Sequence, residues 1–464
     1  MVFSSLVFLC LFLPAVLLLY YLSKNITYRN FVLVVASLFF YAWGEPVWVI
    51  LLVYSALVDY LHGRIIDEYY GRWQATAALV SSVTVNLAIL ATCKYSGFIV
   101  QNINQLLHTS FSVPALSLPL GISFYTFQTM SYTIDLYRGN TRVQKSLLKF
   151  MTYVSMFPQL VAGPIVRYTD VAYQLRKRRT SFQLFSEGVL RFVCGLSKKV
   201  ILANNAGNIA TLLLGSDSSS LAAASAWLGI IMYAFQIYFD FSGYSDMAIG
   251  LGKMLGFRFP ENFNYPYISR SITDFWRRWH ISLSTFFRDY VYIPLGGNRY
   301  RPLRNILIVW FLTGLWHGAS WNFILWGVYY GLILIIEKYL FHGKLQLLPA
   351  PLCHLYSLVL ILFGWSFFYF TDMGVLGGFL KNLFCIGTPL YDLTTISVFT
   401  SNLWLILLCT VAATPLPLLL YRAFCRRSRT FTAISAPLLI TAGMVVCFIL
   451  LVGQSYNPFL YFRF

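Results

Sequence analysis

Apolar runs of membrane-spanning length follow one another along almost the whole chain, and short polar or basic stretches separate them. Several runs are shorter than a full span or contain glycine and proline, so we expect some of them to be re-entrant or broken. The pattern predicts an all-α polytopic membrane protein with about 11–12 transmembrane helices, besides re-entrant and interfacial helices. The apolar runs are residues 2–22, 30–43, 47–62, 75–93, 116–137, 183–214, 226–252, 305–317, 321–341, 352–371, 403–421 and 432–453.

The clearest interruption lies in residues 150–166, which are apolar but contain Pro158, Gly163 and Pro164. Irregular backbone at membrane depth is tolerated only where protein or a water-filled cavity covers it. We therefore predict a broken segment that is buried in the protein. The sequence shows no internal repeat and no soluble stretch of domain size, so we interpret residues 1–464 as a single membrane-embedded domain.

Composition excludes a soluble protein, because 58% of the residues are hydrophobic and only 11% are charged, whereas a soluble domain has roughly 25% charged residues. The first apolar run has no basic segment before it and no small-residue cleavage site after it, so we interpret it as a retained span. The eight cysteines are scattered, without a Cys-x-x-Cys or Cys/His pairing, so we expect neither disulfides nor a metal site.

The net charge of +18 reflects 34 basic and 16 acidic residues. The basic residues are divided among the loops between apolar runs, which favours an effect of membrane topology over nucleic-acid binding. If these loops are cytoplasmic, the N-terminus lies outside, and the protein crosses the cell membrane many times. The basic loops are residues 23–29, 63–73, 138–149, 167–182, 253–304, 338–349 and 422–430.

His317 is the strongest candidate for chemistry, because a titratable ring at membrane depth is costly and is usually functional. We expect one helix to end at His317, Gly318 to break it, and Ser320 to cap a second helix that begins at Trp321. The positive end of the second helix would keep the imidazole neutral, and its backbone N–H groups could stabilise an oxyanion. A general base and oxyanion donors in one turn suit acyl transfer to a hydroxyl. The alternative is a buried structural histidine.

Two neighbours of His317 are candidate substrate-binding residues. Asn322 could orient the imidazole or the acyl carbonyl, and Trp316 adds aromatic lining beside the ring.

Residues 273–290 carry an apolar stripe at helical spacing, which predicts one amphipathic helix along the cytoplasmic membrane interface, in contact with lipid. His280 lies at the edge of the stripe, so we expect it to point toward protein. It is the second candidate catalytic residue, orienting substrate or assisting proton transfer beside His317. The alternative is a packing histidine bonded to a backbone carbonyl. The stripe consists of Trp276, Trp279, Leu283, Phe286, Phe287 and Tyr290.

Arginines are concentrated around the two histidines, more densely than topology alone requires. Arg277 and Arg278 are the candidates for binding a phosphate-bearing cytosolic donor, and the alternative is contact with anionic lipid. The whole group is Arg270, Arg277, Arg278, Arg288, Arg299, Arg301 and Arg304.

Asp240 and Asp246 are carboxylates within an otherwise apolar run. Asp240 is a candidate for binding substrate, and the two could also bind a cation, relay protons or orient the base. The alternative is that tyrosine and serine hydroxyls and a nearby arginine satisfy both carboxylates and lock helix packing. Both interpretations stay open.

Seven segments resemble the membrane-bound O-acyltransferase family, and most closely its bacterial branch that acetylates alginate and peptidoglycan. They extend over essentially the whole chain. The segments are 41–46, 121–128, 157–164, 238–246, 275–280, 315–318 and 457–464.

The resemblance implies a ring of transmembrane helices around a central tunnel, with His317 matching the essential histidine and His280 a second active-site position. It implies acetyl-CoA as the acyl-donor substrate, no bound cofactor, and an exported cell-surface polysaccharide as the destination of the acetyl group. It also implies a bacterial inner membrane and a separate extracytoplasmic acetyltransferase of the SGNH type as partner. We therefore predict a membrane O-acetyltransferase. The alternatives are D-alanyl transfer to teichoic acid from a carrier protein and a transporter or polysaccharide channel.

Overall fold

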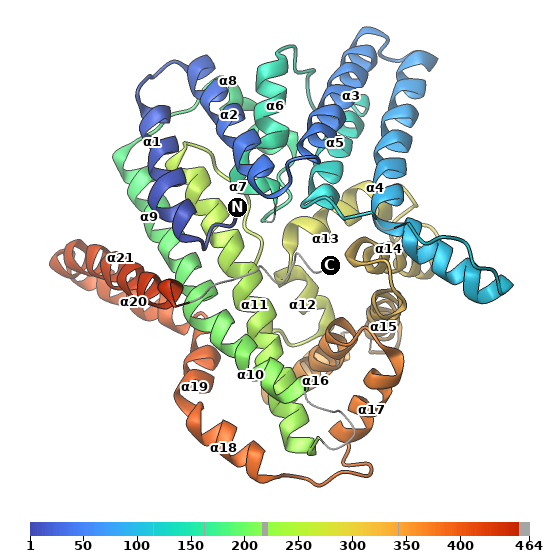
Figure 1. Ribbon diagram of the computed structural model, residues 1–464, viewed down its shortest axis with the longest axis vertical. Coiled ribbons are helices and arrows are strands. Elements are labelled where there is room, and N and C mark those ends of the chain that lie inside the picture. Colours follow the sequence, from blue (N-terminus) through green and yellow to red (C-terminus); the bar gives the residue numbers. More distant parts are fainter. Residues whose placement is uncertain (115, 162, 216–220, 342, 454–464) are drawn as a thin grey trace. The chain divides into compact units, whose positions relative to one another are not determined.

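The computed structural model describes residues 1–464 except 115, 162, 216–220, 342 and 454–464. The described residues form helices joined by loops, with no strand among them (Figure 1). The terminal segment 457–464 that contributed to the family resemblance lies outside the described residues. Contacts divide the chain into two compact units, Met1–Phe192 with Ser245–Pro260, and Val193–Tyr244 with Glu261–Phe464. The interpretation of residues 1–464 as one domain stays a prediction.

The first unit contains a series of helices from the N-terminal part of the chain, together with the end of α11. They are η1 (Phe8–Phe12), α1 (Leu13–Tyr21), α2 (Ile26–Gly44), α3 (Val49–Glu68), α4 (Trp73–Leu107), α5 (Ile122–Tyr137), α6 (Leu147–Ser155), α7 (Phe157–Leu160), α8 (Tyr168–Arg176) and most of α9 (Phe182–Ser197).

The second unit holds the two candidate catalytic histidines. Its elements are η2 (Lys198–Ala203), α10 (Asn204–Leu214), most of α11 (Ala223–Met254), η3 (Pro266–Ile268), α12 (Ile272–Arg278), α13 (Ile281–Phe287), η4 (Arg288–Tyr292), α14 (Pro302–His317), α15 (Trp321–Ile336), η5 (Glu337–Phe341), η6 (Lys344–Leu347), α16 (Ala350–Tyr369), α17 (Met373–Leu383), α18 (Leu393–Ser401), α19 (Leu403–Ala412), α20 (Leu416–Arg427) and α21 (Arg429–Val452).

Six helical segments among the described residues are long and apolar enough to cross a membrane, or seven if the bent pair α18 and α19 forms one span. This confirms the predicted all-helical membrane class, but the count is lower than the 11–12 spans expected from apolar runs. The difference has local causes. The first run divides into a short π-helix and α1, α5 has only 16 residues, and α11 carries two carboxylates. The six segments are Ile26–Gly44, Val49–Glu68, Trp73–Leu107, Trp321–Phe341, Ala350–Tyr369 and Ala433–Val452.

The predicted interruption in residues 150–166 is confirmed. Helix α6 ends at Ser155, α7 has four residues, and the described residues 161 and 163–166 that follow are buried and lie outside helices. Polar side chains of the first unit satisfy this irregular backbone. The hydroxyl of Tyr153 donates to the Val166 carbonyl at 3.3 Å, and the amide of Gln159 donates to the Tyr153 carbonyl at 2.6 Å. The break is therefore covered by protein, as membrane burial requires.

A buried polar network that the sequence did not indicate joins α3, α4 and α5 in the first unit. The carboxylate of Asp59 accepts from the Ser82 hydroxyl at 2.6 Å and from the Asn86 amide at 2.8 Å. The Asn86 carbonyl in turn accepts from Ser55 and Thr129 at 3.1 and 3.3 Å. Interhelical hydrogen bonds of this kind hold membrane helices together where the hydrophobic effect cannot.

Helices α14 and α15 pack closely in the second unit because glycines line their contact (Figure 1). A Cβ on Gly314 would lie 2.4 Å from the Phe323 carbonyl oxygen, and one on Gly327 would lie 2.3 Å from the Trp310 carbonyl oxygen. Small residues of this kind let membrane helices approach closely. The hairpin delivers His317 to the short connection between the two helices.

Candidate active site

His317 is the last residue of α14, and α15 begins at Trp321, as the sequence predicted. A Cβ on Gly318 would lie 2.2 Å from the Phe323 ring, so a larger residue in the turn would have to displace that ring. Ser320 occupies the N-cap position but makes no capping hydrogen bond, and its hydroxyl donates to the Asn322 side-chain oxygen instead. The expected side-chain cap is therefore wrong, because Asn322 competes for the hydroxyl.

Aromatic rings surround the His317 imidazole, which is 6% exposed. Trp316 precedes it in the chain with a centroid distance of 4.9 Å. Trp326 of α15 and Phe368 of α16 lie at 4.8 and 5.2 Å, both edge-on to the imidazole. Three helices therefore fix the ring by packing, and Trp316 is buried beside it, where the sequence placed it.

The predicted single helix over residues 273–290 is wrong, because the chain breaks at His280. Helix α12 ends at Arg278 and α13 begins at Ile281, with His280 between them at a left-handed φ of +43°. The preceding loop supplies the hydrogen bonds that the helix loses. The backbone N–H of Ile281 donates to the Asn262 carbonyl at 3.0 Å, and that of Asn264 donates to the Arg278 carbonyl at 2.9 Å. These contacts outweigh the helical periodicity of the stripe.

His280 points into the protein, as predicted, and is 1% exposed. Phe241 of α11 lies edge-on at a centroid distance of 4.7 Å, and Trp316 lies at 5.9 Å. Burial lowers the pKa of His280 to about 3, so the ring is neutral near pH 7. Since Trp316 contacts both His280 and His317, the structure brings the two candidate catalytic rings together around one indole.

Asn322 is fully buried, and both polar atoms of its side-chain amide form hydrogen bonds within the protein. Its Nδ2 donates to the Phe367 carbonyl of α16 at 3.0 Å, and its Oδ1 accepts from Ser320. These bonds tie the start of α15 to α16 beside His317. They position the turn, while a role in binding substrate stays a prediction.

Both carboxylates of α11 form ion pairs. In the second unit, Asp240 lies 2.6 Å from the Lys199 ammonium, and both side chains are buried. In the first unit, Asp246 accepts from the Arg191 Nε at 2.8 Å. The partner of Asp240 is thus a lysine, where an arginine was expected. The pairs favour the packing interpretation, because a buried carboxylate needs a fixed countercharge.

The arginines around the histidines mostly face outward. Arg277 is exposed, and Arg278 donates to the Asp274 carboxylate at 2.9 Å within α12. The other five members of the group, Arg270, Arg288, Arg299, Arg301 and Arg304, are also exposed. Their position suits contact with an anion that approaches from water or from the membrane surface.

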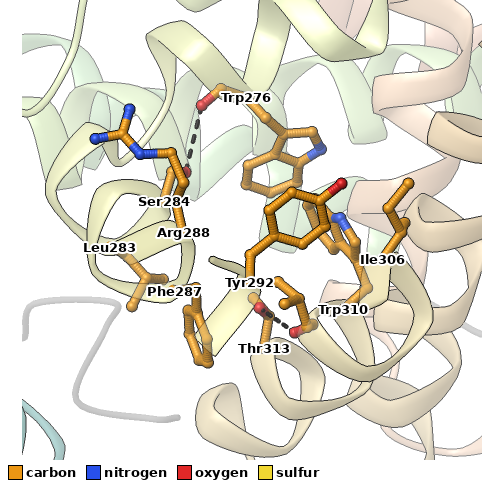
Figure 2. Close-up of a pocket in the computed structure, with 10 residues that line it drawn as sticks. Trp276, Leu283, Ser284, Phe287, Arg288, Tyr292, Ile306, Trp310 and Thr313 are labelled. Carbon is orange, nitrogen blue, oxygen red and sulfur yellow. Dashed lines mark hydrogen bonds between the residues drawn. The ribbon is translucent and has the colours of Figure 1, made fainter. Parts of the chain in front are cut away.

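An apolar pocket of about 200 Å³ lies among the elements that carry the two histidines. Figure 2 shows the Trp276, Tyr292 and Trp310 rings on one side, while the Arg288 guanidinium extends away from them. Trp276 also contacts Trp326 at a centroid distance of 5.5 Å. Because Trp326 lies against His317, a single indole separates the pocket wall from that imidazole.

Comparison with known proteins assigns this helical membrane protein to a family. Residues 106–373 match the membrane-bound O-acyltransferase family. The chain belongs to this family. It is therefore an O-acyltransferase with a polytopic, all-helical membrane fold, and the resemblance seen in the sequence is confirmed.

Individual members of the membrane-bound O-acyltransferase family align over most of the chain. The probable alginate O-acetylase AlgI of Pseudomonas aeruginosa is 44% identical over 397 residues, which are 84% of this chain and 76% of the relative. The protein of the same name from Pseudomonas putida is 40% identical over 493 aligned positions, 100% of both chains. The peptidoglycan O-acetyltransferase of Helicobacter pylori is 35% identical over 406 residues, 79% of this chain and 77% of the relative.

Asn262 is a residue of this candidate site that the sequence did not indicate. It is 1% exposed and its side-chain oxygen contacts the His280 ring at 3.1 Å. Its position between Glu261 and Phe263 has no helical periodicity, so no pattern linked it to His280.

Among the described residues, no group of three or more His, Cys, Asp or Glu side chains is arranged to hold a metal. The expectation that no metal takes part stays a prediction.

Proposed function

We propose that this O-acyltransferase takes acetyl from cytosolic acetyl-CoA and passes it across the membrane for O-acetylation of an exported polysaccharide. The observation that carries the proposal is the pair of buried histidines around Trp316 in a membrane O-acyltransferase. The names of the relatives, alginate O-acetylase and peptidoglycan O-acetyltransferase, support acetyl as the acyl group and a polysaccharide as its destination.

In the proposed chemistry His317 is the general base. Its imidazole removes the proton of an acceptor hydroxyl as the hydroxyl oxygen attacks the thioester carbonyl, and the thiolate of the coenzyme leaves. The aromatic surroundings exclude water, which protects the thioester from hydrolysis. His280 assists from the other side of Trp316 by orienting the hydroxyl or the carbonyl.

The donor would approach through the pocket in Figure 2. Its volume of about 200 Å³ and its lining by Trp276, Phe287 and Trp310 suit an uncharged, flexible thioester arm. Arg288 at its edge, and Arg277 and Arg278 on the neighbouring α12, would hold the phosphates of the coenzyme. Asp240, Asn322 and Trp316 remain candidates for contacting substrate, although the first two also have structural partners.

The proposal includes a location and partners. The protein lies in the bacterial inner membrane with its N-terminus outside, so that its basic loops face the cytoplasm. Lipid surrounds its exposed apolar helices, and an SGNH-type acetyltransferase on the outer side receives the acetyl group for the polymer.

Purified full-length protein in lipid nanodiscs tests the enzymatic part. With acetyl-CoA labelled in the acetyl group, we expect release of free coenzyme that depends on added acceptor and on His317. Consumption of a D-alanyl carrier protein instead of acetyl-CoA would replace acetylation with D-alanyl transfer. Consumption of neither, with polysaccharide crossing proteoliposomes, would identify a channel. Mass analysis of the cell-surface polysaccharide with and without the gene then identifies the polymer.

A further inference from the structure

The side-chain oxygen of Asn262 is a shared acceptor for groups on both sides of the His280 turn. The His280 Nδ1 lies 3.1 Å from it, the Ser282 hydroxyl 2.9 Å, and the Ser282 backbone nitrogen 3.3 Å. All three residues are buried, so water does not compete for these bonds. One amide oxygen therefore organises the turn and the ring together.

These contacts determine which nitrogen of His280 carries the proton. A backbone N–H can only donate, so the Asn262 atom that faces the Ser282 backbone must be the amide oxygen. An amide oxygen can only accept, so Nδ1 of His280 must be the donor. In a neutral imidazole a proton on Nδ1 leaves the lone pair on Nε2.

The surroundings of His280 keep the ring in that neutral form. Phe241 and Trp316 contact it with their rings, and burial lowers its pKa to about 3. Near pH 7 a single tautomer is therefore populated. The left-handed φ of +43° is an unfavourable backbone conformation. It is held by the same residue, since the Asn262 carbonyl accepts from the Ile281 backbone at 3.0 Å.

We infer that Asn262 is a positioning residue for acyl transfer, which holds His280 as the Nδ1-protonated tautomer with Nε2 as its basic nitrogen. The inference rests on the proposed function, in which His280 assists the reaction. The Nε2 lone pair accepts a hydrogen bond from the acceptor hydroxyl, and this contact orients the hydroxyl for His317. The other tautomer would present an N–H to the same hydroxyl and would orient it wrongly.

Kinetic tests compare three variants of the full-length protein in nanodiscs. Asn262→Ala removes the acceptor and should lower kcat about 10- to 100-fold, by analogy with the loss of hydrogen-bond partners that orient metal-bound histidines, with KM for acetyl-CoA unchanged. Asn262→Asp keeps an oxygen opposite Nδ1 and should recover most of the lost rate. Ser282→Ala is the matched control, because it removes a donor to the same oxygen but leaves His280 untouched. Equal losses in Asn262→Ala and Ser282→Ala, or no recovery in Asn262→Asp, would overturn the inference.

A spectroscopic test does not depend on activity. In protein labelled with ¹⁵N-histidine, the His280 signals are those that disappear in His280→Gln. We expect the proton on Nδ1 in the unmodified protein, in Ser282→Ala and in Asn262→Asp, which keeps an acceptor oxygen opposite Nδ1, and a mixture of tautomers in Asn262→Ala. A proton on Nε2 in the unmodified protein overturns the inference even if the enzyme is active. A proton on Nδ1 in a protein that transfers no acetyl overturns the proposed function, and with it the catalytic part of the inference.

Discussion

The two candidate catalytic histidines lie at two helix breaks that hold their rings in different ways. At the break between α12 and α13, a hydrogen bond that His280 donates to the Asn262 side-chain oxygen defines the orientation of the ring. At the break between α14 and α15, aromatic rings from three helices enclose His317. The first residue adopts a left-handed conformation, whereas the second closes an ordinary helix and leaves the tight turn to Gly318.

The two ways of holding an imidazole suit two different tasks in acyl transfer, which are orienting the substrate and accepting its proton. A hydrogen bond selects one tautomer and one edge of an imidazole, which suits a group that orients substrate. An aromatic enclosure excludes water and fixes the position of the ring, which suits a base that must accept and release a proton. The comparison therefore supports His317 as the base and His280 as the assisting residue.

The largest expected effect comes from removing the proposed base. His317→Ala should lower acetyl transfer about 10²- to 10⁴-fold, the usual contribution of a general base, while the protein remains in the membrane. His280→Ala should cost less, because an orienting contact is lost and not the base. The rate of coenzyme release from labelled acetyl-CoA measures both. His354→Ala is the control, since the Nδ1 of this α16 histidine bonds to the Ser269 backbone carbonyl at 3.1 Å and the residue has no role in the proposed chemistry. A larger loss in His280→Ala than in His317→Ala would reverse the assignment.

The next prediction concerns the buried ion pair between Asp240 and Lys199 in the second unit, which lies next to a ring neighbour of His280 in the sequence. Asp240 precedes Phe241, whose ring contacts His280, and it is paired with Lys199 at 2.6 Å. Asp240→Asn leaves a buried ammonium without its countercharge and should lower stability by about 3–5 kcal/mol. Thermal unfolding in detergent measures the loss.

A double variant separates packing from substrate binding at the same pair. Lys199→Met with Asp240→Leu removes both charges and should regain most of the stability. If the pair only locks the helices, acetyl transfer returns with stability. A stable double variant that remains inactive would assign Asp240 to substrate binding, which is the alternative that the sequence left open.

The sequence predicted the features that depend on neighbouring residues in the chain. It did not predict the features that depend on contacts between residues far apart in the chain. The end of α14 and the start of α15 were predictable, because Gly318 and the residues around it are local signals. The break at His280 was not, because the apolar stripe keeps its helical spacing across it. Contacts with a loop 18 residues earlier cause the break, and no local pattern records them. The pairing of Asp240 with Lys199 could not be predicted for the same reason, because the two residues are far apart in the sequence.

Membrane spans show the opposite limitation. Counting apolar runs predicted more spans than the described helices support, because hydrophobicity alone does not distinguish a full span from a short buried helix such as α5. The buried polar network around Asp59 could not be predicted from the sequence either. A single acidic residue in an apolar run carries no indication that Ser82 and Asn86 lie opposite it.

The glycines at the contact between α14 and α15 test whether close packing of these two helices is needed to enclose His317. Gly327→Ala places a Cβ 2.3 Å from a backbone oxygen of Trp310, whereas Gly331→Ala places one 3.2 Å from the Trp310 Cβ. Overpacking of this kind costs about 1–3 kcal/mol, so we expect Gly327→Ala at the upper end and Gly331→Ala at the lower. Gly377→Ala is the control, since nothing lies within 4 Å of its added Cβ. Thermal stability and acetyl transfer should fall together in the first two. Full activity in a destabilised Gly327→Ala would show that close packing of α14 on α15 is not needed to place His317.

The smallest effect concerns the ionisation of His280. Its pKa is lowered from 6.5 to about 3 in the folded protein, chiefly because burial disfavours the charged ring. Below pH 6.5 the unfolded chain therefore binds a proton that the folded protein does not, and stability falls as the pH decreases toward about 3. His280→Gln removes this contribution, so its thermal stability should decrease less than that of the unmodified protein between pH 7 and pH 5. Ser282→Ala keeps the histidine and should retain the full decrease. An unchanged pH dependence in His280→Gln would mean that the ring is charged or hydrated in the folded protein, and the contrast between an uncharged, hydrogen-bonded His280 and an aromatically enclosed His317 would no longer hold.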